Sequence, residues 1–186
     1  MGTGNFPVPI CFSTLRRMDS KLIAFYRGQA PDAAGRAIAD IWSWDHRRLE
    51  MVHDYIQWLF PLPEASRFNP DAPLLSAADI KAFRESPDLQ ARVRKSLDVM
   101  LDFFGLSRSG AVITRAAKSS AAHWLEPLNH NHLRLTRILL FLRHAGLQAE
   151  ARGLLGCLED IAAHEGHDVI SARTLTFWRA ALDQLA

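Results

Sequence analysis

Apolar residues recur three and four positions apart along most of the chain, a spacing typical of α-helices that bury one face. The pattern predicts a first helix that begins after Asp19, as its N-cap, and stops at Gly28. A second helix is predicted over residues 35–44, and a third over residues 46–60 with Asp45 as its cap. Prolines that follow the third helix end it.

The second half of the chain carries equally clear helix starts. Ser76 and Asp79 form a capping-box pattern, and Ser86 followed by Pro87 is a favoured N-cap with a favoured first helical residue. Ser171 is a candidate cap for the last helix. The helices predicted from these starts and from the apolar spacing cover residues 76–86, 87–104, 129–146, 147–166 and 171–186.

Strand signals are almost absent, because no Asn-Gly or Asp-Gly turn joins two alternating runs. Residues 107–122 are weakly periodic and are interpreted as a loop or a poor helix, and residues 63–75, with three prolines, as an ordered loop. Apolar residues surround almost the whole circumference of helix 129–146, which is therefore the predicted buried centre. The sequence predicts an all-α fold of about seven helices in a single domain, residues 1–186.

Composition and charge narrow the class of protein. Of the 186 residues, 48% are hydrophobic and 23% charged, as is ordinary for a soluble globular protein with one core. A formal net charge of +2 is too small for a dedicated nucleic-acid-binding protein, so nucleic-acid binding is a less favoured hypothesis. The residues that would serve it are Arg47, Arg48, Arg92, Arg94 and Lys95.

The expected environment is the cytoplasm. Cys11 and Cys157 lie far apart and match no CxxC or metal-ligand spacing, which favours reduced thiols. The first twelve residues lack the charged start and long apolar run of a secretion signal, and no apolar run is long enough to span a membrane.

The most informative stretch is HDYIQWLFPL, residues 53–62, which mixes His, Asp and Gln with Tyr, Trp and Phe. On a continuous helix, the polar residues of this region fall on one flank beside the apolar stripe; they are His46, Glu50, His53 and Gln57. His53, oriented by Glu50, is then a candidate ligand anchor or proton-transfer group. The alternative is a buried histidine whose hydrogen bonds are satisfied within the fold.

A second group of polar residues opens helix 129–146. His130, Arg134 and Arg137 share one face, and Asn131 lies in line with the buried positions. The two arginines are candidates for a clamp on a carboxylate or phosphate, with His130 and Asn131 as orienting groups. In the alternative, the arginines pair with acidic side chains of neighbouring helices, and Asn131 caps or cross-links the core.

Large aromatic side chains are more typical of a core than of a binding site, and this is the expectation for Trp42, Trp44, Tyr55 and Trp124. Trp58 is the exception, because it would be a binding anchor if it were exposed beside the loop 63–75. Metal binding is not expected: Glu50 and His53 have the spacing of di-iron ligands without a second such pair, and His164 with His167 lacks further ligands nearby. No nucleophile motif or phosphate-binding loop is present, so no cofactor is predicted.

Three stretches together resemble the conserved region of the opioid growth factor receptor family. They are FYRG at residues 25–28, LEMVHDYIQWLFPL at 49–62 and HNHLRLTRIL at 130–139. Their order and separation also match, with MLDFFGL between the last two, and the resemblance extends over residues 22–182.

The resemblance implies a receptor-type domain. Animal members are described as intracellular, nuclear-associated receptors for the enkephalin peptide called opioid growth factor, with long tails beyond the conserved region. This compact chain, which prefers Arg and Ala, is expected to be a bacterial member. Because no catalytic residues are established in the family, only motif positions are carried over: His53, Tyr55, Gln57, Trp58, His130, Asn131, Arg134, Thr136 and Arg137. Position 132 is aromatic in many relatives, which argues against a chemical role for His132.

These observations predict a non-enzymatic binding domain whose pocket lies where helix 46–60, the loop 63–75 and the start of helix 129–146 meet. The expected ligand is a small anion or a peptide carboxylate. The candidate ligand-binding residues are His53, Gln57, Trp58, His130, Asn131, Arg134 and Arg137. The rival hypothesis is an enzyme that uses His53 or His130 as an acid-base group, and close approach of the two imidazoles would favour it.

Overall fold

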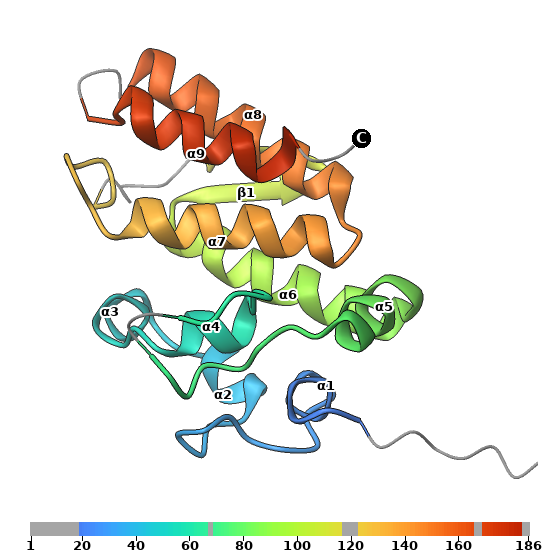
Figure 1. The fold of residues 1–186 in the computed structure, drawn as a ribbon. Helices are drawn as coiled ribbons and strands as arrows, with labels where there is room; N and C mark the ends of the chain where they lie inside the picture. The colour runs from blue at the N-terminus through green and yellow to red at the C-terminus, as the bar shows by residue number, and fades with distance from the viewer. Residues whose placement is uncertain (1–18, 67–68, 117–122, 166–168, 184–186) are drawn as a thin grey trace, which may run out of the picture.

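The computed structural model describes residues 19–66, 69–116, 123–165 and 169–183. Within these ranges nine helices and a two-stranded sheet form the regular structure (Figure 1). The helices are α1 (Lys21–Tyr26), α2 (Ile38–Trp42), α3 (His46–Met51), α4 (Tyr55–Leu59), α5 (Ala77–Glu85), α6 (Pro87–Phe103), α7 (Asn131–His144), α8 (Gln148–His164) and α9 (Ala172–Asp183). The strands are β1 (Leu106–Ser109) and β2 (Val112–Arg115). The all-α prediction is confirmed, with nine helices in the described part of the chain in place of about seven.

Most helix starts agree with the sequence. Side-chain oxygens of Asp45, Ser76 and Ser86 accept hydrogen bonds from main-chain N–H groups in the first turns of α3, α5 and α6. Ser76 and Asp79 form the predicted capping box. Ser171 caps α9 through its Oγ, which accepts a main-chain N–H group of the first turn at 3.1 Å. These starts are local features, so the sequence is sufficient to predict them.

The cap of α1 differs from the prediction by one residue. The Oγ atom of Ser20, and not the carboxylate of Asp19, accepts the N–H group of Ile23. Asp19 instead pairs with Arg27, whose Nη1 atom lies 2.5 Å from a carboxylate oxygen. The ion pair removes the acidic side chain from the helix start, where serine caps equally well.

The prediction of one helix over residues 46–60 is wrong, because the chain breaks it into α3 and α4. Val52 ends α3 in an extended conformation, with φ −93° and ψ 134°. Carbonyl groups at the end of α3, which a continuous helix would pair with the next turn, are thereby left to other donors. The single polar flank that a continuous helix would present does not form.

Residues 106–115 form a β-hairpin, in contrast to the loop or poor helix predicted for this stretch. The strands are antiparallel, with Leu106 opposite Arg115 at the open end. Gly110 begins the two-residue turn with φ +61°, a conformation that glycine adopts without a steric cost. This Gly-Ala turn is a weaker hairpin signal than Asn-Gly or Asp-Gly. Residues 117–122 lie outside the described ranges.

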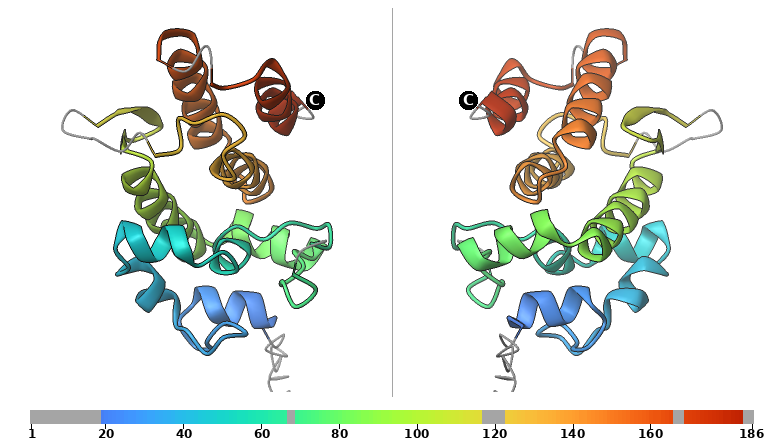
Figure 2. Two further views of the ribbon diagram at one scale, coloured as in Figure 1. Left: turned by 90° about the vertical axis from the view of Figure 1, so that its left-hand side faces the viewer. Right: turned by 90° about the vertical axis from the view of Figure 1, so that its right-hand side faces the viewer.

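Helix α7 lies in the middle of the molecule, between α8 and α9 on one side and α3 and α4 on the other (Figure 1). Figure 2 shows α1 and α2 at the end of the molecule farthest from α8 and α9. Leu135, Leu139 and Leu142 are fully covered, as expected for the central helix. Leu133 is 69% exposed, so α7 keeps one open face. That open face is available to form part of a site.

A cluster of aromatic rings ties α1, α4, α5 and α7 together. The ring centroids of Tyr26 and Phe83 are 4.8 Å apart, and those of Phe83 and Phe141 are 5.2 Å apart. Phe25 packs edge-on against Trp58 at 5.2 Å. Such edge-to-face pairs add to the hydrophobic contribution of burying large rings. The short helices α1 and α4 are thus held against the longer ones by packing.

Two observations bear on the expected environment of the chain. None of the helices in the described ranges combines the length and the apolarity that a membrane crossing needs. Cys157 is a buried free thiol on α8, and burial raises its pKa to about 11. Cys11 and His167 lie outside the described residues.

Candidate ligand-binding site

Arg134 of α7 joins the end of α3 to the centre of the fold. Its side chain is 5% exposed, and Nη1 donates a hydrogen bond to the Leu49 carbonyl at 3.0 Å. Nη2 donates to the carbonyl groups of Glu50, at 3.4 Å, and Val52, at 3.1 Å. A continuous helix would have paired these carbonyls with its own next turn. Arg134 therefore caps α3 in place of the missing helical turn.

Asn131 and Glu50 complete the surroundings of Arg134. Nη1 of Arg134 also donates to Oδ1 of Asn131 at 3.2 Å, and Nδ2 of Asn131 donates to a Glu50 carboxylate oxygen at 3.1 Å. The same carboxylate lies 3.8 Å from Nη1 of Arg134. Asn131 is fully buried, which matches the cross-linking alternative for this residue. The four Nη hydrogens of Arg134 are all used within the described part of the chain.

His53 and His130 face each other beside Glu50. Their ring centroids are 5.3 Å apart, and Nε2 of His130 lies 3.3 Å from a Glu50 carboxylate oxygen. Partial burial lowers the pKa of His130, against the opposing effect of the Glu50 carboxylate. The two imidazoles, from separate segments of the chain, are close enough for one ligand group to contact both.

A pocket of about 370 Å³ lies between α4, α7 and the start of the loop that follows α4; we call it the α4/α7 pocket. Five of the seven candidate residues line it: His53, Gln57, His130, Arg134 and Arg137. Its apolar lining comes from Ile56, Leu62, Leu133 and Leu140, and Ser66 and Thr136 complete it. The volume is that of a site for a small molecule or a few residues of a peptide.

Arg137 supplies positive charge to the α4/α7 pocket. Its Nη1 atom donates to the Phe60 carbonyl at the end of α4, at 3.1 Å, whereas Nε and Nη2 donate to no described residue. Burial lowers the pKa of Arg137, with Glu64 opposing the effect, yet an arginine stays protonated near neutral pH. Arg137 is thus a half-buried cation with N–H groups left for a ligand.

Gln57 fastens the loop that forms one wall of the pocket. Its Nε2 atom donates to Ser66 Oγ at 3.0 Å, and its Oε1 atom accepts a hydrogen bond from Asn69 Nδ2 at 2.6 Å. The far end of the loop is held by the N–H group of Leu75, which donates to the Leu62 carbonyl at 3.1 Å. Gln57, with its amide engaged on both sides, positions the wall.

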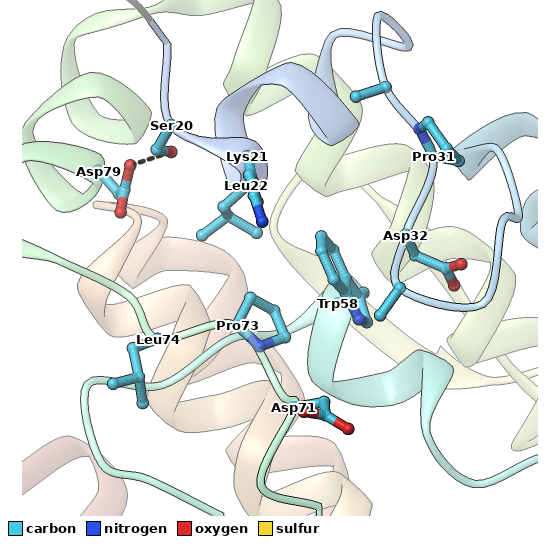
Figure 3. Close-up of a pocket in the computed structure, with 12 residues that line it drawn as sticks. Ser20, Lys21, Leu22, Pro31, Asp32, Trp58, Asp71, Pro73, Leu74 and Asp79 are labelled. Atoms are coloured by element: carbon cyan, nitrogen blue, oxygen red, sulfur yellow. Dashed lines mark hydrogen bonds between the residues drawn. The ribbon is translucent and has the colours of Figure 1, made fainter.

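Trp58 faces a different side of α4 and does not line the α4/α7 pocket. It lies in a larger hollow of about 750 Å³ between the loop at residues 30–33 and the loop at residues 71–74 (Figure 3). A smaller neighbouring hollow is lined by Trp58 together with His53 and Gln57, so Trp58 borders these two candidates from the other side of α4. Asn131 is likewise absent from the lining of the α4/α7 pocket, because it is buried behind it.

Sequence reasoning missed His123, which lies near this group. Its Nε2 atom is buried and has no hydrogen-bond partner in the described ranges, and its ring centroid is 4.6 Å from that of Phe103. Burial lowers the pKa of His123. No spacing of residues in the sequence points to a role for His123, because its neighbours come from distant parts of the chain. Within the described residues, no group of three or more His, Cys, Asp and Glu side chains is arranged to hold a metal ion.

The sequence of this chain is similar to one protein family and to several named proteins of animals. The family model for the opioid growth factor receptor (OGFr) conserved region matches residues 16–184. The opioid growth factor receptor of Mus musculus is 34% identical over 134 residues, which cover 68% of this chain and 21% of the mouse protein. That of Homo sapiens is 34% identical over 140 residues, with 70% and 20% covered.

A second group of relatives carries a different name. Opioid growth factor receptor-like protein 1 of Xenopus tropicalis is 37% identical over 114 residues, which cover 60% of this chain and 22% of that protein. The chain spans about a fifth of the length of these curated relatives. No solved structure matches it.

Proposed function

The chain belongs to the opioid growth factor receptor conserved-region family, and we propose that it is a single, non-enzymatic binding domain for a small anionic ligand such as a peptide carboxylate. The proposed site is the α4/α7 pocket. The observation that carries the proposal is Arg137, a half-buried cation whose Nε and Nη2 groups donate to none of the described residues and which lies beside an apolar lining. Its relatives are named receptors, which supports a ligand-binding role for the shared region.

The pocket offers each part of such a ligand a partner. The Nε and Nη2 groups of Arg137 would donate to the carboxylate, in the forked arrangement that guanidinium groups favour. Ile56 and Leu140 would cover an apolar side chain next to that carboxylate. His53 and His130 would contact polar groups of the ligand other than the carboxylate, such as a peptide N–H or carbonyl group. Arg134 would act indirectly, because its own donors already hold α3 in place.

The test is a titration followed by two-dimensional NMR of the ¹⁵N-labelled protein. The probes are N-acetyl-Phe-Leu with a free carboxylate and the same dipeptide as its amide. The free acid should shift the signals of Ile56, Leu62 and Arg137, and the amide should bind about tenfold more weakly because a charge-assisted hydrogen bond is lost. Equal affinities for the two probes would overturn the proposal.

Matched variants assign the effect to one side chain. Arg137→Gln should weaken binding of the acid by about tenfold and leave binding of the amide unchanged. Arg152→Gln, which removes an exposed charge on α8, should change neither affinity. The proposal would also be contradicted if the folded protein failed to bind N-acetyl-Phe-Leu at millimolar concentration.

Acid-base catalysis is the second candidate function, and the 5.3 Å separation of the His53 and His130 rings favours it. Because burial lowers its pKa, His130 is neutral and able to accept a proton near neutral pH. A panel of p-nitrophenyl esters tests this function. Turnover that is lost in His130→Gln but kept in His164→Gln would support it, and absence of turnover with the whole panel would oppose it.

Three further parts of the prediction stay proposals. A bacterial source is supported by the preference for Arg and Ala, and a cytoplasmic location by the spacing of Cys11 and Cys157, which favours reduced thiols. Nucleic-acid binding is less favoured, since Arg92 pairs with an acidic side chain at 3.2 Å and Arg94 with another at 2.6 Å, both within the fold.

A further inference from the structure

Trp58 lies in a groove that does not include Arg137 and that meets the α4/α7 pocket only at His53 and Gln57, which line both. Figure 3 shows its indole between the loop that carries Pro31 and the loop that carries Pro73, with Lys21 and Asp71 along the same opening. A second hollow of about 360 Å³ adjoins it and shares Ala33, Trp58 and Asp71 with it. We call these two connected hollows the Trp58 groove. Both hollows are lined by Trp58, so they meet at the indole, and together they suit an extended ligand better than a compact one.

The indole N–H of Trp58 donates no hydrogen bond to any described residue, although the side chain is only 6% exposed. By contrast, the indoles of Trp42, Trp124 and Trp178 each donate to an oxygen, at distances from 2.9 to 3.2 Å, whereas the indole of Trp44, 9% exposed, shares with Trp58 the lack of an acceptor among the described residues. Buried tryptophans usually have such a partner. The N–H group of Trp58 is not sealed inside the core but borders the groove. A ligand with a carbonyl group could satisfy it.

Two charged groups of the groove are also unpaired. The carboxylate of Asp71 and the amine of Lys21 are exposed, and neither forms an ion pair in the described part of the chain. The neighbouring carboxylate of Asp32, in contrast, is bound by Arg36 at 2.6 Å. Asp71 belongs to both hollows, so a negative charge lies midway along the groove beside the indole.

We propose that the Trp58 groove binds an extended, proline-containing peptide segment of a partner protein, with a basic residue opposite Asp71. A polyproline II segment has no internal hydrogen bonds, so its carbonyl groups are free to accept the indole N–H. Its pyrrolidine rings would pack against Trp58, Pro31 and Pro73, as proline-rich ligands do in aromatic grooves. The partner is thus basic, whereas the ligand proposed for the α4/α7 pocket is an anion.

The experiment uses acetyl-Ala-Pro-Pro-Arg-Pro-Pro-Ala-amide, a probe without any carboxylate. In ¹⁵N-labelled protein, the indole N–H signal of Trp58, identified by its absence in Trp58→Phe, should move downfield as the peptide is added. Trp58→Phe and Asp71→Asn should each weaken binding by about fivefold or more, the loss expected for one hydrogen bond or one ion pair. A probe with glutamate in place of arginine should bind correspondingly more weakly.

Control variants separate this proposal from the preceding one. Asp183→Asn, at an exposed position of α9, and Arg137→Gln in the α4/α7 pocket should both bind the peptide as the unmodified protein does. The proposal is overturned if the Trp58 signal does not move at millimolar peptide, or if Asp71→Asn binds with unchanged affinity. The Asp71 variant decides the matter even if Trp58→Phe fails to fold, because Asp71 is exposed.

Discussion

Nη1 of Arg134, on α7, lies 3.0 Å from the carbonyl oxygen of Leu49, 85 residues earlier in the chain at the end of α3. This contact accounts for the break in the helix predicted over residues 46–60. Arg134 caps α3, and Arg137, one turn further along α7, caps α4 through the Phe60 carbonyl. Helix α7 thus supplies hydrogen-bond donors to carbonyl groups at the ends of α3 and α4. The helix ends would otherwise leave these carbonyl groups without a partner.

Replacing Arg134 with methionine should lower the free energy of unfolding by about 3 kcal/mol, because it leaves the carbonyl groups of Glu50 and Val52 without their donor and removes the positive charge beside the Glu50 carboxylate. Arg137→Met removes a single such bond at a half-buried site and should cost about 1 kcal/mol. Urea denaturation of both variants measures the difference. Equal losses would mean that Arg134 does not hold α3.

Gly153, on α8, lies against the turn of the β-hairpin. A Cβ atom at this position would be 1.9 Å from the carbonyl oxygen of Ala111, so Gly153→Ala must push α8 and the hairpin apart. We expect a loss of about 2 kcal/mol in the free energy of unfolding, typical of overpacking.

Gly156 on the same helix provides the control for Gly153. A Cβ atom there would meet nothing within 4 Å, so Gly156→Ala should stabilise the protein by about 0.5 to 1 kcal/mol through helix propensity alone. Thermal denaturation of the two variants should therefore shift the midpoint in opposite directions. A stabilised Gly153→Ala variant would contradict the close contact with Ala111.

Gln57→Leu should loosen the loop between α4 and α5, because it removes the side-chain hydrogen bonds to Ser66 and Asn69. The amide of Leu75, at the far end of that loop, should exchange with deuterium about tenfold faster, as a loss of about 1.4 kcal/mol in local stability requires. Gln90→Leu, which removes one exposed side-chain hydrogen bond on α6, should leave this exchange rate unchanged. Unchanged exchange in Gln57→Leu would show that the amide does not hold the loop.

The sequence was sufficient for features that are decided locally. The caps at Ser76 and Ser86 depend on residues within one turn, and both were predicted correctly. Gln57 and Arg134 line one pocket, and each lies in a short stretch of sequence that combines an apolar face with polar groups. What these residues bind stays a prediction.

The features that the sequence did not predict depend on distant contacts. The break at Val52 is stabilised by Arg134, which no window around residue 52 contains. The hairpin around Gly110 is covered by α8, where Gly153 leaves space for the turn. In both places the local pattern is ambiguous, and a partner from another part of the chain decides the conformation.

Protonation of buried histidines should make the protein less stable in acid. His132 is 6% exposed, and its Nε2–H group donates to the Trp124 carbonyl at 3.0 Å. Burial lowers the pKa of His132 below its ordinary 6.5, and the hydrogen bond to Trp124 only partly opposes this. The unfolded chain therefore binds protons first as the pH falls, so stability is fully present above pH 6.5 and is lost from there toward the lowered pKa.

His132→Phe tests this assignment, because phenylalanine keeps the ring between Trp124 and Trp178 but cannot titrate. The free energy of unfolding, measured by urea denaturation at about pH 7.5 and about pH 5, should fall less in His132→Phe than in the unmodified protein. His164→Gln, at an exposed position of α8, should keep the full pH dependence. An equal loss of stability in acid for His132→Phe would assign the effect to the other histidines whose pKa values burial lowers, which are His123, His130 and His144.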